Sequence, residues 1–364
     1  MTVVQILYSG LGGHSSVSFS LVEADEQRTY EHVLIFYGIE DLPQAYKAKC
    51  IELGVRFFAV KKNPGFDPSS QKEVAALLKH LEPDVILLHS INLLLPVWRF
   101  SLFRKTRLIA VEHQPNHLKT NLEWIWSFLA MYTARHVVFL TDMYYTQMQR
   151  KIGLFFRKKK VGVINNGINM KRFRSAGHER PADTGIQKIG MLARLTDTKD
   201  HATLLNAFKL LVSEVPGNGF KLYIAGDGDK KASLEEQSRK LGLAEQICFE
   251  GMLAEAESVD FLKGLDIYVH ASLGETMSTS IMQAMACGKP IVASDVPGVN
   301  NMIRHEVTGL LVPSQQAEEM KIAILRLIQD KNLRQELSAH AAEFAEKNYS
   351  NKKMLENYST VFSN

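Results

Sequence analysis

Two cations lie five residues apart in the segment Gly190–Asp200 (GMLARLTDTKD), where a predicted strand gives way to a predicted helix. Arg194 offers a planar fork of N–H donors and Lys199 a compact charge. Together they could neutralise a diphosphate, including the negative charge that grows on a leaving phosphate. On its own, such a pair more often consists of two solvated surface charges. The segment therefore indicates phosphate chemistry only where other residues support it.

A second segment, Ala271–Pro290 (ASLGETMSTSIMQAMACGKP), places a carboxylate beside a predicted helix start. Glu275 follows a predicted strand, and the amides of Thr276–Ser280 open the predicted helix Met277–Ala286. Free N–H groups at a helix start can hold a phosphate while a loop carboxylate accepts hydrogen bonds from sugar hydroxyls. The alternative is an ordinary carboxylate near a helix dipole, with Gln283 as an exposed helix residue.

The first half of the chain carries two weaker signals. The glycine-rich turn Ser9–His14 (SGLGGH) would let the backbone approach a phosphate or a sugar, although it could equally be a tight connection. It does not complete G-x-G-x-x-G, which disfavours a dinucleotide oxidoreductase. His113 follows another predicted strand, where a packed or solvated histidine is the ordinary alternative.

Length and composition bound the architecture. The 364 residues are 46% hydrophobic and 23% charged, with a net charge of +4. This length suits two domains of about 150–180 residues each. The mild basic excess suits phosphorylated sugars or an anionic membrane surface and falls short of a nucleic-acid binder. Three cysteines without metal-ligand spacing, and no signal peptide or long apolar span, predict a cytoplasmic protein without structural zinc.

The elements that must position these residues are short apolar strands alternating with helices. This alternation predicts an α/β protein with parallel sheets, and strands that are apolar on both faces indicate doubly wound sheets. In the first half the predicted strands are Val3–Tyr8, His32–Phe36, Arg56–Ala59, Asp84–Leu88, Leu108–Val111 and His136–Leu140. A last strand and turn, Val161–Ile168, precede the polar stretch Lys171–Gln187. The pattern then restarts, with predicted strands Lys188–Ala193, Lys221–Ala225, Ile247–Phe249, Ile267–Val269 and Pro290–Ala293.

Taken in order, these segments resemble the glycosyltransferase B (GT-B) architecture, and specifically the large retaining glycosyltransferase family 4 (glycosyl transferases group 1). The resemblance is strongest from Val163 to Pro313, through NNGIN, GMLARLTDTKD, LYIAGDGDKKASLE, FEGM, LDIYVHASLGETMSTSIMQAMACGKPIVASDVPG and VTGLLVP. It implies two Rossmann-like domains facing a cleft: an acceptor-binding domain over 1–168 and a nucleotide-sugar-binding domain over 169–346. Residues 347–364 would form a helix that packs back on the first domain.

The resemblance also implies roles for individual residues. Arg194 and Lys199 match the pair that contacts the donor diphosphate, and Glu275 matches the first acid of the E-x7-E signature, which contacts the donor sugar. Gln283 occupies the place of the second acid, which normally accepts from the ribose hydroxyls. This is a departure, because a glutamine keeps one acceptor and adds a donor, so it could hold a ribose more weakly.

Other positions match less directly. The amides of Met277, Ser278 and Thr279 match the phosphate-binding helix start, and Gly251 and Met252 match the turn that flanks the nucleotide base. 

In the first half, Gly12 and Gly13 resemble the family's glycine loop, and His113 resembles the active-site histidine near the transferred sugar. Asp227-Gly228-Asp229 imitates the Asp-x-Asp metal motif of the other glycosyltransferase architecture, but its position before a helix favours a capping or loop role. We therefore expect no cofactor and no essential metal, with cations and helix amides acting in its place.

The implied activity is the retaining transfer of a hexosyl or N-acetylhexosaminyl group from a nucleotide sugar. A UDP-sugar is favoured, GDP is not excluded, and the acceptor is a glycan or a polyprenyl-diphosphate-linked oligosaccharide in cell-surface polysaccharide biosynthesis. Two alternatives stay open: a nucleotide-sugar epimerase on the same plan, and, because Gln283 breaks the signature, a silent subunit that binds nucleotide sugar or membrane.

Two basic and aromatic stretches, Trp98–Lys105 and Leu154–Lys160, favour the headgroup zone of an anionic membrane. A core-facing helix with solvated lysines is the alternative. The hypothesis is peripheral association with the cytoplasmic face of a membrane.

Overall fold

The computed structural model describes residues 1–10, 13–114, 116, 119–174, 187–216 and 219–363. The chain divides into two compact α/β units, one formed by Met1–Asn169 with Ser350–Asn364 and the other by Met170–Tyr349. The first division thus falls one residue beyond the expected boundary at 168, and the second falls three residues beyond the expected boundary at 346.

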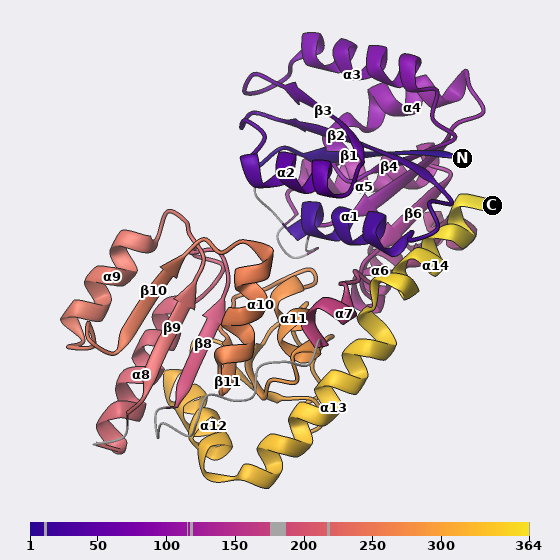
Figure 1. Ribbon diagram of the computed structural model, residues 1–364. Helices are drawn as coiled ribbons and strands as arrows, with labels where there is room; N and C mark the ends of the chain where they lie inside the picture. The colour runs from indigo at the N-terminus through magenta and orange to yellow at the C-terminus, as the bar shows by residue number, and fades with distance from the viewer. Residues whose placement is uncertain (11–12, 115, 117–118, 175–186, 217–218, 364) are drawn as a thin grey trace. The chain divides into compact units, whose positions relative to one another are not determined.

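The first unit contains a seven-stranded parallel sheet in the order β3-β2-β1-β4-β5-β6-β7 (Figure 1). Its strands are β1 (Thr2–Tyr8), β2 (Glu31–Gly38), β3 (Arg56–Lys61), β4 (Val85–Leu88), β5 (Arg107–Glu112), β6 (His136–Phe139) and β7 (Val161–Val163). The winding reverses between β1 and β4. In open α/β sheets, the carboxyl ends of the strands at such a reversal are where ligands bind.

Helices cover both faces of this sheet, as strands apolar on both sides require. One apolar cluster takes Val4 and Ile6 of β1, and another takes Leu7 of the same strand. The helices are α1 (Gly13–Ala24), α2 (Gln44–Glu52), α3 (Pro68–Leu81), α4 (Leu94–Leu102), α5 (Asn121–Thr133), α6 (Asp142–Ile152) and α14 (Asn351–Ser363), with 3-10 turns η1 (Ile91–Leu93), η3 (Gly153–Phe155) and η4 (Lys158–Lys160).

The C-terminal helix α14 lies against α1 within this unit (Figure 1). The side-chain amide of Asn351 donates to the carbonyl of Ser20 at 3.2 Å. At the other end of the helix, Arg107 donates to the carbonyl of Phe362 at 2.8 Å. These bonds attach both ends of α14 to the first sheet and its helices.

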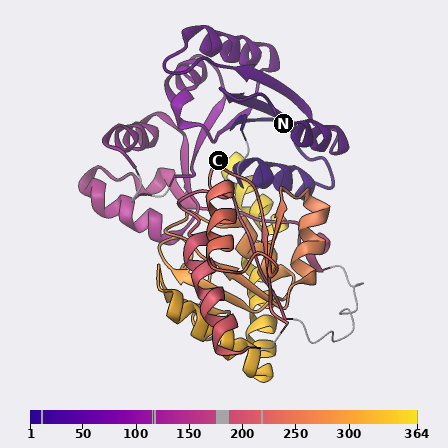
Figure 2. The same cartoon turned by 90° about the vertical axis from the view of Figure 1, so that its left-hand side faces the viewer.

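The second unit contains a six-stranded parallel sheet in the order β10-β9-β8-β11-β12-β13, with helices on both faces (Figures 1 and 2). Its strands are β8 (Lys188–Leu192), β9 (Lys221–Ala225), β10 (Ile247–Gly251), β11 (Ile267–His270), β12 (Ile291–Asp295) and β13 (Leu310–Pro313). Its helices are α7 (Met170–Arg174), α8 (His201–Glu214), α9 (Lys231–Lys240), α10 (Glu255–Gly264), α11 (Thr279–Ala286), α12 (Ala317–Gln329) and α13 (Lys331–Tyr349).

Here the winding reverses between β8 and β11, which are neighbours. The predicted α/β class with two doubly wound parallel sheets is therefore confirmed. The edge strand β13 is an addition, since the sequence did not predict it as a strand. In the described part of the chain, no helix is both long and apolar enough to cross a membrane.

Candidate functional site

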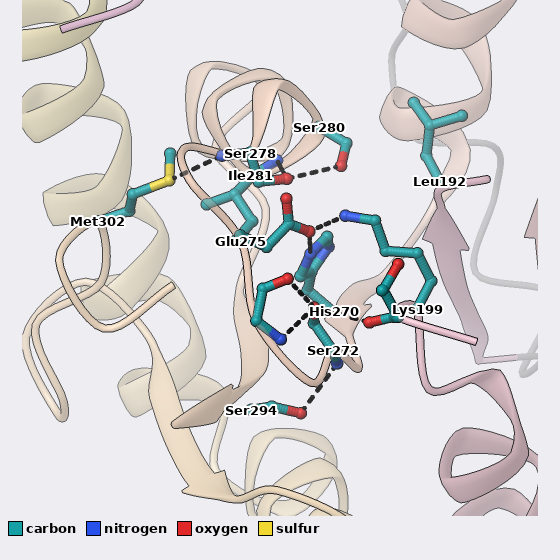
Figure 3. Close-up of polar contacts among 12 residues, drawn as sticks. Leu192, Lys199, His270, Ser272, Glu275, Ser278, Ser280, Ile281, Ser294 and Met302 are labelled. Carbon is teal, nitrogen blue, oxygen red and sulfur yellow. Dashed lines mark hydrogen bonds and ion pairs between the residues drawn. The ribbon is translucent and has the colours of Figure 1, made fainter. Parts of the chain in front are cut away.

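The loops that follow β8 and β11 meet in the second unit. Lys199 in the first loop forms an ion pair with Glu275 in the second (Figure 3). The carbonyl of Thr198 accepts from the amide of Leu273 at 2.9 Å and from the hydroxyl of Ser272 at 3.1 Å. Because β8 and β11 are adjacent parallel strands, their carboxyl ends bring the two predicted segments together.

Three of the predicted charged groups gather here. The side chains of Lys199 and Glu275 are only 14% and 11% exposed. Burial and then the positive charge of Arg194 lower the pKa of Lys199 to about 7. The carboxylate of Glu275 opposes this shift because it favours the charged ammonium. Arg194 itself lies at the surface, so an exposed cation stands near a largely buried one.

The helix beyond Glu275 begins later than the sequence predicted. The helix α11 starts at Thr279, with Ser278 as its N-cap, and the Ser278 hydroxyl accepts from the amide of Ile281 at 3.5 Å. The prediction that the helix starts at Met277 and that the amides from Thr276 open it was wrong. Met277 packs its side chain in the interior instead, and the amide of Ser278 faces the sulfur of Met302 at 3.2 Å.

Of the three predicted phosphate-binding amides, only that of Thr279 therefore belongs to the first helical turn, where N–H groups lack intrahelical acceptors. Thr279 and Gln283 are four residues apart and share one face of α11, and both are partly exposed. Gln283 thus lies one turn beyond the helix start, on the face that it shares with Thr279.

Gly251 is the last residue of β10, and Met252 follows it. Gly251 has a φ of +73°, which favours glycine, and its carbonyl accepts from the amide of Gly226 at 2.7 Å. Met252, the next residue, is 55% exposed.

Asp227-Gly228-Asp229 forms a loop. Asp227 accepts from the amide of Gly228 at 2.8 Å, while the N-cap of α9 is Lys230, which makes no side-chain cap bond. Of the two expected roles, Asp227 takes the loop role. Within the described residues, no group of three or more His, Cys, Asp or Glu side chains is placed to hold a metal ion.

Sequence reasoning missed a histidine and a tyrosine behind Glu275. His270 Nε2 lies 2.7 Å from Glu275 Oε1 (Figure 3). His270 Nδ1 lies 3.1 Å from the Tyr268 hydroxyl. Burial, and then the nearby Lys199 and His201, lower the pKa of His270 well below its usual value. The available signal was a polar residue at the carboxyl end of an apolar strand that leads into the Glu275 loop.

The first unit holds a separate group of histidines at the carboxyl ends of β1, β4 and β5. His113 Nε2 lies 2.7 Å from His89 Nδ1, and its ring centroid lies 5.9 Å from that of His14. Burial is the main cause that lowers the pKa of His113 well below its usual value and that of His89 to about 3. His113 is therefore a neutral, half-buried group at the reversal of the first sheet.

The glycine loop is adjacent to this group. Gly12 lies outside the described residues. Gly13 is the first residue of α1 and is exposed, and the next residue, His14, is the one whose ring faces His113. The predicted residues thus form two groups, one in each unit.

Two family models cover most of the chain. Residues 11–172 match the model described as Glycosyltransferase Family 4, and residues 178–344 match that of Glycosyl transferases group 1. A protein of Methanocaldococcus jannaschii described as an uncharacterized glycosyltransferase is 26% identical over 271 residues, which make up 71% of this chain and 69% of that protein.

Relatives named for an activity match over shorter segments. The alpha-monoglucosyldiacylglycerol synthase of Streptococcus pneumoniae is 30% identical over 143 residues, which span 39% of this chain and 31% of that enzyme. Among solved structures, Anabaena HepE in complex with UDP and glucose superposes with a TM-score of 0.85 at 19% identity, covering 100% of this chain and 99% of that one. The chain therefore belongs to the glycosyltransferases of group 1, and its fold is that of the GT-B enzymes.

Proposed function

We propose that this protein is a retaining glycosyltransferase that moves a hexosyl or N-acetylhexosaminyl group from a UDP-sugar to a glycan or lipid-linked acceptor in cell-surface polysaccharide biosynthesis. The observation that carries the proposal is the meeting of Lys199, Arg194 and Glu275 next to the start of α11. The fold shared with HepE, whose structure holds UDP and glucose, supports a uridine nucleotide as the donor.

The charges at this site suit the departure of a nucleoside diphosphate. In the proposed reaction, the bond from the anomeric carbon to the phosphate oxygen breaks, and the acceptor hydroxyl forms its bond on the same face of the sugar. The departing phosphate takes the hydroxyl proton. Lys199, Arg194 and the first-turn amides of α11 stabilise the negative charge on that phosphate. We propose that this set replaces a metal ion, so activity should persist in excess EDTA.

A panel of UDP- and GDP-sugars tests the donor directly. We expect a UDP-sugar to raise the melting temperature most, because a ligand that binds only the folded state stabilises it. Lys199→Ala should lower turnover far more than it lowers the melting temperature, and full turnover in this variant would exclude the assigned role of Lys199. Isomerised sugar formed from donor alone would favour an epimerase. Donor binding without transfer to any acceptor extract would favour a silent subunit.

The proposal includes peripheral attachment to the cytoplasmic face of a membrane. An apolar stripe on α5, formed by Leu122, Ile125 and Phe128, is 36% to 60% exposed. Phe128 contacts Tyr132 with ring centroids 4.9 Å apart, and the Tyr132 hydroxyl donates to the carbonyl of Phe155 at 3.0 Å. The stripe therefore continues into the predicted basic stretch.

In that stretch, Leu154 is fully exposed, Phe155 is 65% exposed, and Arg157, Lys158 and Lys159 lie at the surface. Apolar side chains flanked by cations are typical of surfaces that bind the headgroup region of anionic membranes. The alternative of a core-facing segment does not hold for Leu154 and Phe155, because both are exposed.

Liposome flotation tests this part. Ile125→Glu and Leu154→Glu should each reduce binding to vesicles that contain an anionic lipid, whereas Ile51→Glu, at a 72% exposed position on α2, should not. Equal flotation with neutral vesicles would remove the electrostatic contribution, and unchanged flotation of the two variants would remove the assigned surface.

A further inference from the structure

The carboxylate of Glu275 has two partners on the same oxygen. Lys199 Nζ forms an ion pair with Oε1, and His270 Nε2 lies 2.7 Å from that oxygen (Figure 3). The two partners are positioned differently. Lys199 reaches Glu275 from a loop on a long side chain, whereas His270 is the last residue of β11 and its side chain is 0% exposed.

The neighbours of His270 allow one tautomer. Its lowered pKa leaves the imidazole neutral, so it carries a single N–H. A carboxylate facing an ammonium can only accept. Burial raises the pKa of Tyr268, whose hydroxyl therefore keeps its proton and can donate. Both contacts are satisfied only if Nε2–H donates to Glu275 and Nδ1 accepts from Tyr268 at 3.1 Å.

The tyrosine is fixed in turn. Tyr268 is fully buried, and its hydroxyl also contacts Ser280 in the first turn of α11 and lies 3.4 Å from the carbonyl of Leu192 at the end of β8. The longer distance to Leu192 leaves His270 as the better acceptor. A chain of hydrogen bonds thus runs from the helix start through Tyr268 and His270 to Glu275.

The backbone under Glu275 is also fixed. Its amide donates to the carbonyl of Pro297 at 3.0 Å, and a Cβ on Gly298 would lie 1.9 Å from the carbonyl oxygen of Glu275. Gly298, with a φ of +87°, lets the two loops touch. The side-chain oxygen Oε1 of Glu275 is held by Lys199 and His270.

In the proposed function, the diphosphate competes with Glu275 for the Lys199 ammonium. Drawing Lys199 toward the donor takes one partner from a carboxylate that is only 11% exposed. We infer that His270 is the positioning residue that keeps the Glu275 carboxylate directed at the donor sugar when Lys199 leaves it, and that Tyr268 selects the tautomer that does so. This inference rests on the proposed function.

Measurements of UDP binding and of sugar transfer distinguish a positioning role of His270 from a structural one. The probe donor is UDP-glucose, or the sugar nucleotide of the panel that stabilises the protein most. His270→Leu should bind UDP within twofold of wild type, because UDP has no sugar for Glu275 to contact. Its kcat/KM for transfer or donor hydrolysis should fall by about 10- to 100-fold, the range expected for a lost hydrogen bond to a charged group. His270→Gln should recover most of the loss, because its amide nitrogen can occupy the place of Nε2.

His32→Leu is the matched control, since it removes a buried strand histidine of the first unit and should leave both quantities unchanged. Wild-type kcat/KM in His270→Leu would overturn the inference. A parallel loss of UDP affinity and melting temperature that glutamine does not rescue would also overturn it, because that pattern marks a merely structural role.

A spectroscopic test needs no substrate. Nitrogen-15 NMR of histidine-labelled protein, with His270→Leu for assignment, should show the Nε2–H tautomer in the wild type and a mixture in Tyr268→Phe. An Nδ1–H tautomer in the wild type would overturn the inference even if transfer is observed. If the wild type neither binds nucleotides nor transfers sugar, the proposed function fails by itself, whatever the tautomer.

Discussion

Proton uptake on donor binding should reveal the unusual state of Lys199. Its pKa is lowered to about 7 by burial and by Arg194, while His270 and His201 beside it are neutral because their pKa values are lowered too. A diphosphate prefers the ammonium form. Above pH 7 the site must therefore take up a proton to bind the donor, and affinity should fall as pH rises. Below pH 7 the ammonium is already present, so affinity should level off.

The size of the proton uptake follows from the pKa of Lys199. At pH 8 a group with a pKa of about 7 is roughly one-tenth protonated, so binding should take up about 0.9 protons per donor. The dissociation constant should rise up to tenfold per pH unit between pH 7 and 8.5. UDP-glucose is the suitable probe, because its diphosphate has no terminal phosphate with a second pKa of about 6.

Calorimetry in buffers of different ionisation enthalpy measures this uptake. Lys199→Arg should abolish it, because a guanidinium stays charged throughout the range. Lys199→Ala should bind more weakly and without pH dependence. If wild-type protein binds UDP-glucose at pH 8 with no proton uptake, the ion pair with Glu275 keeps Lys199 charged, and the reasoning from burial fails.

Three further outcomes follow from single contacts. Gly298→Ala should cost about 2–4 kcal/mol in the free energy of unfolding because its Cβ would collide with a backbone oxygen, whereas Gly242→Ala, with a similar φ of +71° and open space, should cost about 1 kcal/mol. Chemical denaturation compares them. Lys119→Met should lower the free energy of unfolding by about 3–5 kcal/mol, because it removes the ion-pair partner of the buried Glu112 carboxylate. Adding Glu112→Gln should recover part of that loss in the same assay. Gln283→Glu should tighten UDP binding about 3- to 10-fold in calorimetry by giving the ribose a charged acceptor, and weaker binding would contradict the role assigned to this position.

Much of the fold was predictable because the strands are buried on both faces. Runs such as His136–Leu140 and Lys221–Ala225 are apolar after their first residue and match β6 and β9 to within a residue. The edge strand β13 could not be predicted in this way, because its four residues follow a glycine and end in a proline, a pattern that is typical of a turn. The start of α11 depends on which of several adjacent serines and threonines caps the helix, and the sequence offers more than one candidate; in the structure Ser278 is the cap and Met277 is buried before it.

The meeting of the charged residues Lys199 and Glu275 could be predicted from the topology, whereas the role of the neutral His270 could not. Lys199 and Glu275 each follow a strand, and strands on either side of a reversal bring such residues together. The role of His270 depends on its direction at the last residue of β11 and on the tyrosine two residues earlier, which share one side of the strand. Alternation alone indicates an ordinary buried pair at these positions.

Neutral histidines lie at strand ends in both units. His89 and His113 follow β4 and β5, and His270 ends β11, so all three lie at or beside the reversals of their sheets. Burial makes each of them neutral, which leaves one donor and one acceptor and no charge. A charged residue in place of His270 would compete with Lys199 for Glu275. In the proposed function, the neutral imidazole of His270 orients Glu275 while the positive charge stays on Lys199 and Arg194, which stabilise the leaving phosphate.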